Sequence, residues 1–268
     1  MDAVSTDLIE PFYIIFTSIF QKQDSSLPDL LIQLRYRRYQ KEKKGMYMGQ
    51  VTYKEIKNLE EVNEYIRQGN EMLGALGFTD HSTEHALIVA TKAGKILQKL
   101  NYGKRDIELA KIAGYLHDLG NCINRTDHAH LGAILAKDIL KECGMSFTEI
   151  ALVMNAIGSH DEATGCAVNP ISAALILADK TDVRRNRVRN KAKEAFDKHD
   201  RVNYAVISSN LEIQIEKKTI LFEIRLDESI CSMMDYFEIF LQRMLMCKRA
   251  AEVLGMRFKM TANGNKIC

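Results

Sequence analysis

The spacing of apolar residues predicts that most of the chain is helical. From residue 52 to about 195, apolar positions recur every three or four residues, as they do in helices with one buried face. Gly103 is expected to end a helix over residues 84–100, and Asp106 to cap the helix that follows. Capping residues predict two further helix starts, at Ser146 with Glu149 and at Asn169 with Pro170.

After Asp200 the apolar period shortens to two, which is typical of strands. Three short strands are expected over residues 202–208, 211–216 and 220–226. A long helix over residues 229–254 follows, and residues 257–262 can add a last strand. The predicted fold class is therefore mainly α, a helical bundle with a small C-terminal α+β appendage.

The chain is expected to divide into three parts. The first 44 residues hold two of the three prolines and a basic stretch from Arg35 to Lys44, unlike the residues that follow. Residues 1–48 are therefore predicted to be a loosely attached N-terminal extension. Residues 49–198 are predicted to form the helical domain. Residues 199–268 are predicted to form a small α+β domain with a three-stranded antiparallel sheet and a long helix.

Composition and charge exclude several classes of protein. Apolar residues make up 46% of the chain and charged residues 27%, as in an ordinary soluble globular protein. A net charge of +2 argues against a nucleic-acid partner. No apolar run reaches the roughly 18 residues that span a bilayer, which argues against a membrane protein. The six cysteines form no CxxC pair, and no secretory signal is evident, so a cytoplasmic location with reduced thiols is expected.

The residue types suited to chemistry gather in one part of the sequence. Six of the seven histidines fall between residues 81 and 160, several of them at the ends of apolar helices. His117 and Asp118 close one such helix, and Asp179 continues an apolar helix stripe. A buried carboxylate costs free energy unless it is paired or bound to a metal. Taken alone, the position of Asp179 is explained equally well by metal binding and by a salt bridge to Lys180.

The order of these residues resembles that of the HD-domain superfamily of metal-dependent phosphohydrolases. That family has the pattern H…HD…H…H…D, and the resemblance covers about residues 80–190. The segment from Leu177 to Arg185 looks like the last motif of bacterial members. The resemblance implies an HD-type bundle that binds divalent metal ions. The two-metal branch of the family binds two ions, and the sequence does not distinguish between Mn, Fe, Ni and Mg. The implied metal ligands are His85, His117, Asp118 and Asp179 for one ion, and His128 and His160 for a second ion, with Asp118 bridging the two.

The same resemblance implies hydrolysis of a nucleotide or related phosphoester by metal-activated water. His117 and Asp118 are the catalytic residues in this interpretation. The basic cluster after Asp179 is expected to bind the substrate phosphate, through Lys180, Arg184 and Arg185. The implied partner is a small phosphorylated molecule, and a homodimer is compatible with the apolar spacing in the last long helix.

Two alternatives remain open at this stage. In the first, the same ligands bind metal and nucleotide without turnover, as a catalytically silent regulatory module. Asn121 favours this, since many family members have lysine at that position. In the second, a mixed-valence di-iron centre reacts with O₂. The family's Gly-Tyr-Pro signature is absent, which argues against cyclic-dinucleotide cleavage. Neighbouring polar residues are predicted to lie outside the ligand set: His81, His130, Asp161 and Glu162.

Overall fold

The computed structural model describes residues 50–190 and 196–268. The predicted N-terminal extension therefore lies outside the described residues. All described elements belong to one compact unit, residues 50–268. The predicted division of this unit at residue 198 stays a prediction. Within the described ranges, every helix is too short or too polar to cross a membrane.

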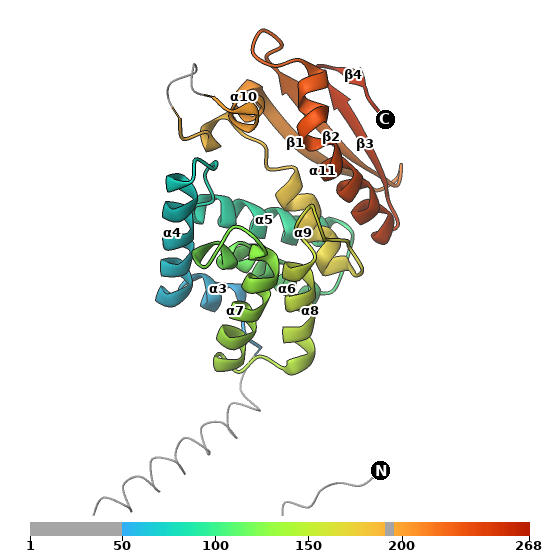
Figure 1. Cartoon of the computed structure of the whole chain (residues 1–268). Helices are drawn as coiled ribbons and strands as arrows, with labels where there is room; N and C mark the ends of the chain where they lie inside the picture. Colours follow the sequence, from blue (N-terminus) through green and yellow to red (C-terminus); the bar gives the residue numbers. More distant parts are fainter. Residues whose placement is uncertain (1–49, 191–195) are drawn as a thin grey trace, which may run out of the picture. The chain divides into compact units, whose positions relative to one another are not determined.

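A bundle of helices forms the larger part of this unit (Figure 1). At its centre lies α9 (Pro170–Lys180), whose residues from Ile171 to Ala178 are all buried. Such all-round apolar character is expected of a helix that is covered on every side. Its neighbours include helices that precede it and one that follows it in the sequence. The bundle helices before α9 are α3 (Tyr53–Lys57), α4 (Glu60–Ala75), α5 (Thr83–Lys99), α6 (Lys104–Leu116), α7 (His128–Glu142) and α8 (Phe147–Gly158).

Two of the predicted helix starts are confirmed. Asn169 accepts a hydrogen bond from the Ser172 backbone, and Pro170 occupies the first turn of α9. Ser146 accepts one from the Glu149 backbone at the start of α8. The side chain of Glu149 does not complete a capping box, because it accepts two hydrogen bonds from Arg105 instead.

The predicted boundary between α5 and α6 needs correction. The left-handed residue after α5 is Asn101, with a φ of 60°, and not Gly103. Gly103 is the N-cap of α6, and Asp106 lies in the first turn of that helix. The reason is that asparagine also tolerates the left-handed conformation, so this turn did not require glycine.

The C-terminal sheet has four strands rather than the predicted three, and it is not purely antiparallel. Its order is β1–β2–β3–β4, with β2 and β3 parallel and the other two pairs antiparallel. Parallel neighbours need a crossover connection, which α11 (Met233–Val253) provides. The strands are β1 (Val206–Gln214), β2 (Thr219–Leu226), β3 (Arg257–Ala262) and β4 (Asn265–Lys266).

The first two predicted strands are also corrected. Residues 206–214 form one continuous strand, and residues 202–205 belong to the helix α10 (Lys198–Ala205). Val202 and Ala205 are buried at a spacing of three, which suits a helix, and Asp197 caps its start. The helix that begins at this cap therefore extends into the segment where the strand was expected.

A buried tyrosine of α11 provides a stability prediction. Among the described residues, the Tyr236 hydroxyl is buried without a hydrogen-bond partner. Removing an unsatisfied buried hydroxyl removes its desolvation penalty, so Tyr236→Phe is expected to raise the free energy of unfolding by about 1 kcal/mol in urea denaturation. The matched control is Tyr115→Phe, which loses a 2.7 Å hydrogen bond to Asn63 and is expected to cost about 1 kcal/mol. A destabilised Tyr236→Phe would contradict this account of the core.

Candidate metal centre

Three of the predicted site residues come from two neighbouring helices. His85 lies in the first turn of α5, and His117 is the residue at which α6 ends. Asp118 follows, just before a 3₁₀ turn over Leu119–Cys122. Adjacent helical residues point about 100° apart, so the end of α6 is what allows His117 and Asp118 to face one point. The structure places the pair at a helix end, as the sequence predicted.

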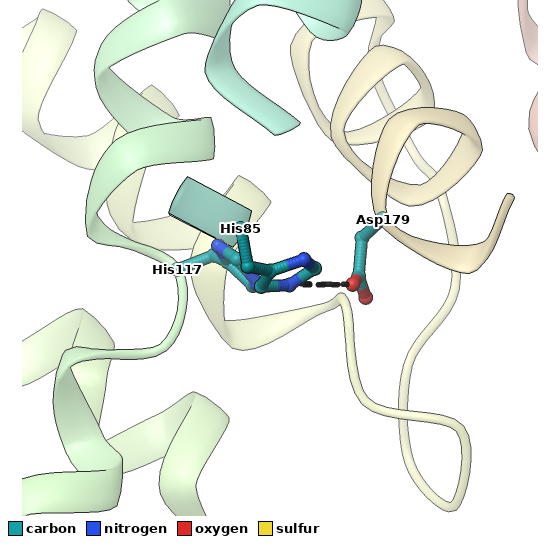
Figure 2. Close-up of side chains that lie close together, drawn as sticks. All are labelled: His85, His117 and Asp179. Atoms are coloured by element: carbon teal, nitrogen blue, oxygen red, sulfur yellow. Dashed lines mark hydrogen bonds and ion pairs between the residues drawn. The ribbon is translucent and has the colours of Figure 1, made fainter. Parts of the chain in front are cut away.

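The first group of potential ligands comes from α5, α6 and α9. The Nε2 atoms of His85 and His117 lie 3.3 Å apart. Asp179 Oδ1 lies 3.4 Å from the His85 Nε2 and 3.7 Å from the His117 Nε2. Figure 2 shows both rings and the carboxylate pointing toward one another. These three side chains could hold one ion between them.

Asp118 lies between this group and a second one. Its Oδ2 atom is 3.1 Å from the His117 Nε2 and 3.7 Å from the His85 Nε2. Its Oδ1 atom is 3.6 Å from the His128 Nε2 and 3.9 Å from the His160 Nε2. The Nε2 atoms of His128 and His160 are themselves 3.2 Å apart. One carboxylate therefore faces a pair of histidines on each side.

The outer nitrogens of the four histidines fix how the rings are protonated. Nδ1 of His117, His128 and His160 lies 2.9, 3.1 and 2.6 Å from the carbonyl oxygens of Gly114, Arg125 and Ile157. Carbonyl oxygens only accept, so each Nδ1 donates its proton, and the lone pair of a neutral ring is left at Nε2. His85 donates in the same way to the Asp182 carboxylate at 2.8 Å. The Nε2 lone pairs of all four histidines therefore face the space around the Asp118 carboxylate.

This convergence fits a bound cation. Lone pairs that face one another at 3.2 to 3.3 Å repel unless a positive charge lies near them. In addition, Asp118 Oδ2 is a buried atom with no hydrogen-bond partner among the described residues. A buried carboxylate oxygen left in this way is costly unless a metal or a donor satisfies it. Imidazole and carboxylate donors suit divalent transition metals.

The pKa values of the two carboxylates and of His160 point the same way, whereas Asp118 outweighs burial and raises the pKa of His117, so that a proton can take the place of a metal at this ring. Burial would raise the pKa of Asp118, but the surrounding histidines, led by His117, hold it well below its usual range. Burial also opposes ionisation of Asp179, and Lys180 and His85 hold its pKa well below normal. Burial lowers the pKa of His160 far below its ordinary value. Ionised carboxylates and a neutral imidazole are the protonation states that a metal needs.

Comparison with known proteins agrees with this arrangement. Residues 83–204 match the family model of the HD domain, a span that contains all six predicted ligands. The chain thus carries a segment that matches the HD domain, over residues 83–204. It is 32% identical over 173 residues to "Uncharacterized protein MJ1020" of Methanocaldococcus jannaschii, covering 55% of this chain and 65% of that one.

Other relatives carry functional names. The match to "Ribonuclease Y 1" of Pediococcus pentosaceus is 31% identical over 115 residues, 42% of this chain and 20% of that protein. A solved structure, a predicted HD superfamily hydrolase from an uncultured Thermotogales bacterium, is 26% identical and covers 47% of this chain and 68% of that one, with a TM-score of 0.37. The chain thus spans just under two thirds of MJ1020 and about a fifth of that ribonuclease.

A cavity of about 140 Å³ opens beside the HD residues. Asp118, His128, His160 and Asp179 line it. His81 also lines it and donates toward the Thr79 carbonyl at 2.8 Å, outside both ligand groups. The remaining predicted non-ligands lie around the site: His130 is exposed, Asp161 is 3.9 Å from His128 Nδ1, and Glu162 pairs with Arg243.

Only one of the three residues predicted to bind phosphate lies at the cavity. Lys180 lines the cavity, 2.8 Å from Asp179, which is the salt bridge that the sequence left open. Arg184 instead pairs with Asp182 and Glu84, and Arg185 stacks on Tyr204. Neither of these two guanidinium groups belongs to the cavity lining formed by the described residues. The reason is that α9 ends at Lys180, so helical spacing no longer tells where the following arginines point.

Sequence reasoning did not assign a role to four residues around the centre. Asp182 is buried and holds His85 through Nδ1, and it lies beyond the end of α9, where helical spacing gives no guide. Three arginines line the cavity in place of Arg184 and Arg185. Arg187 belongs to the same basic cluster after Asp179, whereas no local motif marked Arg125 and Arg243.

Metal removal gives a direct prediction for this centre. A ligand present at about 100 times its Kd stabilises the folded state by about 2.7 kcal/mol, provided that it binds only that state. Mn²⁺ is therefore expected to raise the melting temperature of chelator-treated protein by roughly 5 to 10 °C, measured by differential scanning fluorimetry. The His130→Ala variant is the control and should keep the full shift. Equal melting temperatures with and without metal would contradict the assignment.

Proposed function

We propose that the chain is a metal-dependent phosphohydrolase acting on a nucleotide or a related phosphoester. The observation that carries the proposal is the convergence of four histidine Nε2 lone pairs around the buried Asp118 carboxylate. Divalent ions bound there would polarise a phosphoryl oxygen and make water a nucleophile at neutral pH.

The proposed assignment of ligands to two ions follows the two groups of side chains. His85, His117 and Asp179 would hold one ion, while His128 and His160 would hold a second. Asp118 has one carboxylate oxygen directed at each group, which supports its assignment to both ions. Because Asp118 would bind metal through both oxygens, it would not act as a free base. Asp182 would keep the His85 ring oriented through the hydrogen bond to Nδ1.

Basic side chains in the same cavity support a phosphorylated substrate. Lys180 and Arg243 are both held by Glu162, at 3.7 and 2.5 Å. Arg125 donates to Asn121, which in turn donates to Asp118 Oδ1 at 2.9 Å. We propose Lys180, Arg125 and Arg243 as the groups that stabilise the charge on the phosphoryl oxygens, in place of Arg184 and Arg185.

A catalytically silent metal- and nucleotide-binding module is the second candidate. Asn121 favours it, since its amide occupies the space beside Asp118 where many HD proteins have lysine. Such a module would bind Mn²⁺ and nucleotide saturably and release no phosphate.

The deciding experiment is phosphoester hydrolysis by the intact chain with Mn²⁺, followed through the alcohol or nucleoside product of each substrate. The substrates would be aryl phosphate mono- and diesters, a nucleotide panel and, because some relatives are named ribonuclease Y, a short RNA. The hydrolase proposal predicts metal-dependent product from at least one small phosphoester, and none after chelation. Saturable binding of metal and nucleotide with no product from any substrate would support the module and overturn the hydrolase.

A further inference from the structure

The cavity at the metal centre contains one arginine that the proposed chemistry does not use. Arg187 lines this cavity, although its side chain is only 7% exposed. It belongs to a short 3₁₀ turn, Arg185–Arg187, which lies beyond the end of α9 and carries none of the proposed metal ligands. A guanidinium group buried to this degree is costly unless a negative group compensates its charge.

Two carbonyl oxygens hold the Arg187 guanidinium in place at the cavity wall. Nε donates to the Asp80 carbonyl oxygen at 2.9 Å, and Nη1 donates to the Asp182 carbonyl oxygen at 2.9 Å. The backbone N–H of Asp80 donates in return to the Arg187 carbonyl oxygen at 2.8 Å. Nη2 donates to none of the described residues. The guanidinium is therefore oriented by protein, and it retains donors that a ligand in the cavity can use.

The positive charge of Arg187 is only partly compensated. Among the described residues, the only carboxylate within 4.0 Å is that of Asp182, whose Oδ2 lies 3.7 Å from Nη1. This carboxylate also accepts hydrogen bonds from His85 at 2.8 Å and from Arg184 at 2.9 Å, and Lys92 lies 3.7 Å from it. Three basic side chains thus share one negative charge. Burial accordingly lowers the pKa of Arg187, although Asp182 opposes the shift.

The part of the wall beside Arg187 adds no negative charge. The loop that accepts its Nε–H contributes four cavity-lining residues, none of them acidic: Gly77, Phe78, Thr79 and His81. Burial lowers the pKa of His81, and the charge of Arg187 lowers it further, so the two side chains are close neighbours. The His81 ring in turn lies against His85, with 5.5 Å between the ring centroids. An anion at Arg187 would therefore lie next to the metal centre.

We propose that Arg187 binds a second phosphate group of the substrate, beside the phosphoryl group that lies at the metal centre. The inference rests on the proposed function and narrows its substrate class to molecules with two adjacent phosphates, such as nucleoside diphosphates. A guanidinium held in a fixed plane suits phosphate, because its N–H groups can donate to two phosphate oxygens at once. The second phosphate would also compensate the buried charge that Asp182 leaves in part unpaired.

The test compares ADP with AMP as substrates at the same free Mn²⁺ concentration, with substrate consumption followed by chromatography. Hydrogen bonds between charged groups contribute about 10- to 100-fold, so the intact protein should prefer ADP in kcat/KM by about that factor. Arg187→Gln removes the charge and should abolish the preference, and Arg187→Lys, which keeps the charge, should restore part of it. Arg184→Gln is the matched control and should retain the preference, because Arg184 contacts the same Asp182 carboxylate without lining the cavity.

The outcomes separate the second phosphate site from the hydrolase. Turnover with no preference for ADP, or a preference that survives Arg187→Gln, overturns the site and leaves the hydrolase intact. Loss of the preference in Arg184→Gln as well would trace the effect to Asp182 and also overturn the site. If neither nucleotide is turned over, calorimetric titration of both into the Mn²⁺-loaded protein decides. Tighter binding of ADP that requires Arg187 would support the site without the hydrolase, whereas equal affinities or no binding would overturn it.

A measurement on the unaltered chain covers the case in which Arg187→Gln does not fold. Crystals of the intact protein would be grown with Mn²⁺ and α,β-methylene ADP, an analogue whose two phosphorus atoms are joined by carbon. The proposal predicts an oxygen of one phosphorus group within hydrogen-bond distance of the Arg187 guanidinium. A bound analogue that leaves Arg187 without such a contact, or no bound analogue at saturating concentration, would overturn it.

Discussion

Asp118→Ala is expected to lower kcat for phosphoester hydrolysis by about three orders of magnitude or more. The carboxylate has one oxygen toward each group of histidines, so its loss removes a ligand from both proposed ions. Metal ions contribute several kcal/mol of transition-state stabilisation, and each 1.36 kcal/mol corresponds to a factor of ten in rate. The measurement is the initial rate of phosphate release with Mn²⁺ at saturating substrate.

A matched carboxylate provides the control for this variant. Asp127 is exposed and lies at the start of α7, close in sequence to His128 but outside both ligand groups. Asp127→Ala should keep the wild-type rate. If Asp118→Ala retains its circular dichroism spectrum and more than a tenth of the wild-type rate, the proposed role of this carboxylate is wrong.

Gly120→Ala is expected to destabilise the fold by about 3 kcal/mol or more, the upper range for overpacking a tight interior. A Cβ atom at Gly120 would lie 2.0 Å from the His128 carbonyl oxygen and 2.6 Å from the Gly132 backbone nitrogen. Both are main-chain atoms of α7, so relief requires the helix itself to move, and His128 with it. Chemical denaturation measures the loss, and metal affinity should fall in parallel.

Gly158→Ala is the matched control, because its added Cβ would meet only side chains at ordinary contact distances of 3.8 and 3.9 Å. This residue ends α8, and alanine there is expected to leave stability unchanged or to raise it by up to about 1 kcal/mol. Comparable stability of the two variants would contradict the close packing of the 3₁₀ turn on α7.

The helices that carry the proposed ligands were more predictable than the surroundings of the site. Helical spacing and caps are local properties, and they located α8 and α9 and the helix end at His117. The distinction between His128 and His130 was also predictable, since only one of them lies on the buried face of α7.

Features that depend on packing between distant segments were not predictable. Arg243 reaches the cavity only because α11 packs against α9, and nothing around it in the sequence records that contact. The parallel pairing of β2 with β3 likewise depends on the α11 crossover. Residues 202–205 were ambiguous because so short a segment fits both a strand and the end of a short capped helix.

The most direct measurement is anomalous diffraction from crystals of the intact protein grown with Mn²⁺. The account predicts anomalous density within coordination distance of Asp118 and of Nε2 atoms from His85, His117, His128 and His160, with each Nδ1 still on its present acceptor. Manganese bound only elsewhere, or an Asp118 carboxylate with no ion beside it at saturating Mn²⁺, would contradict the account.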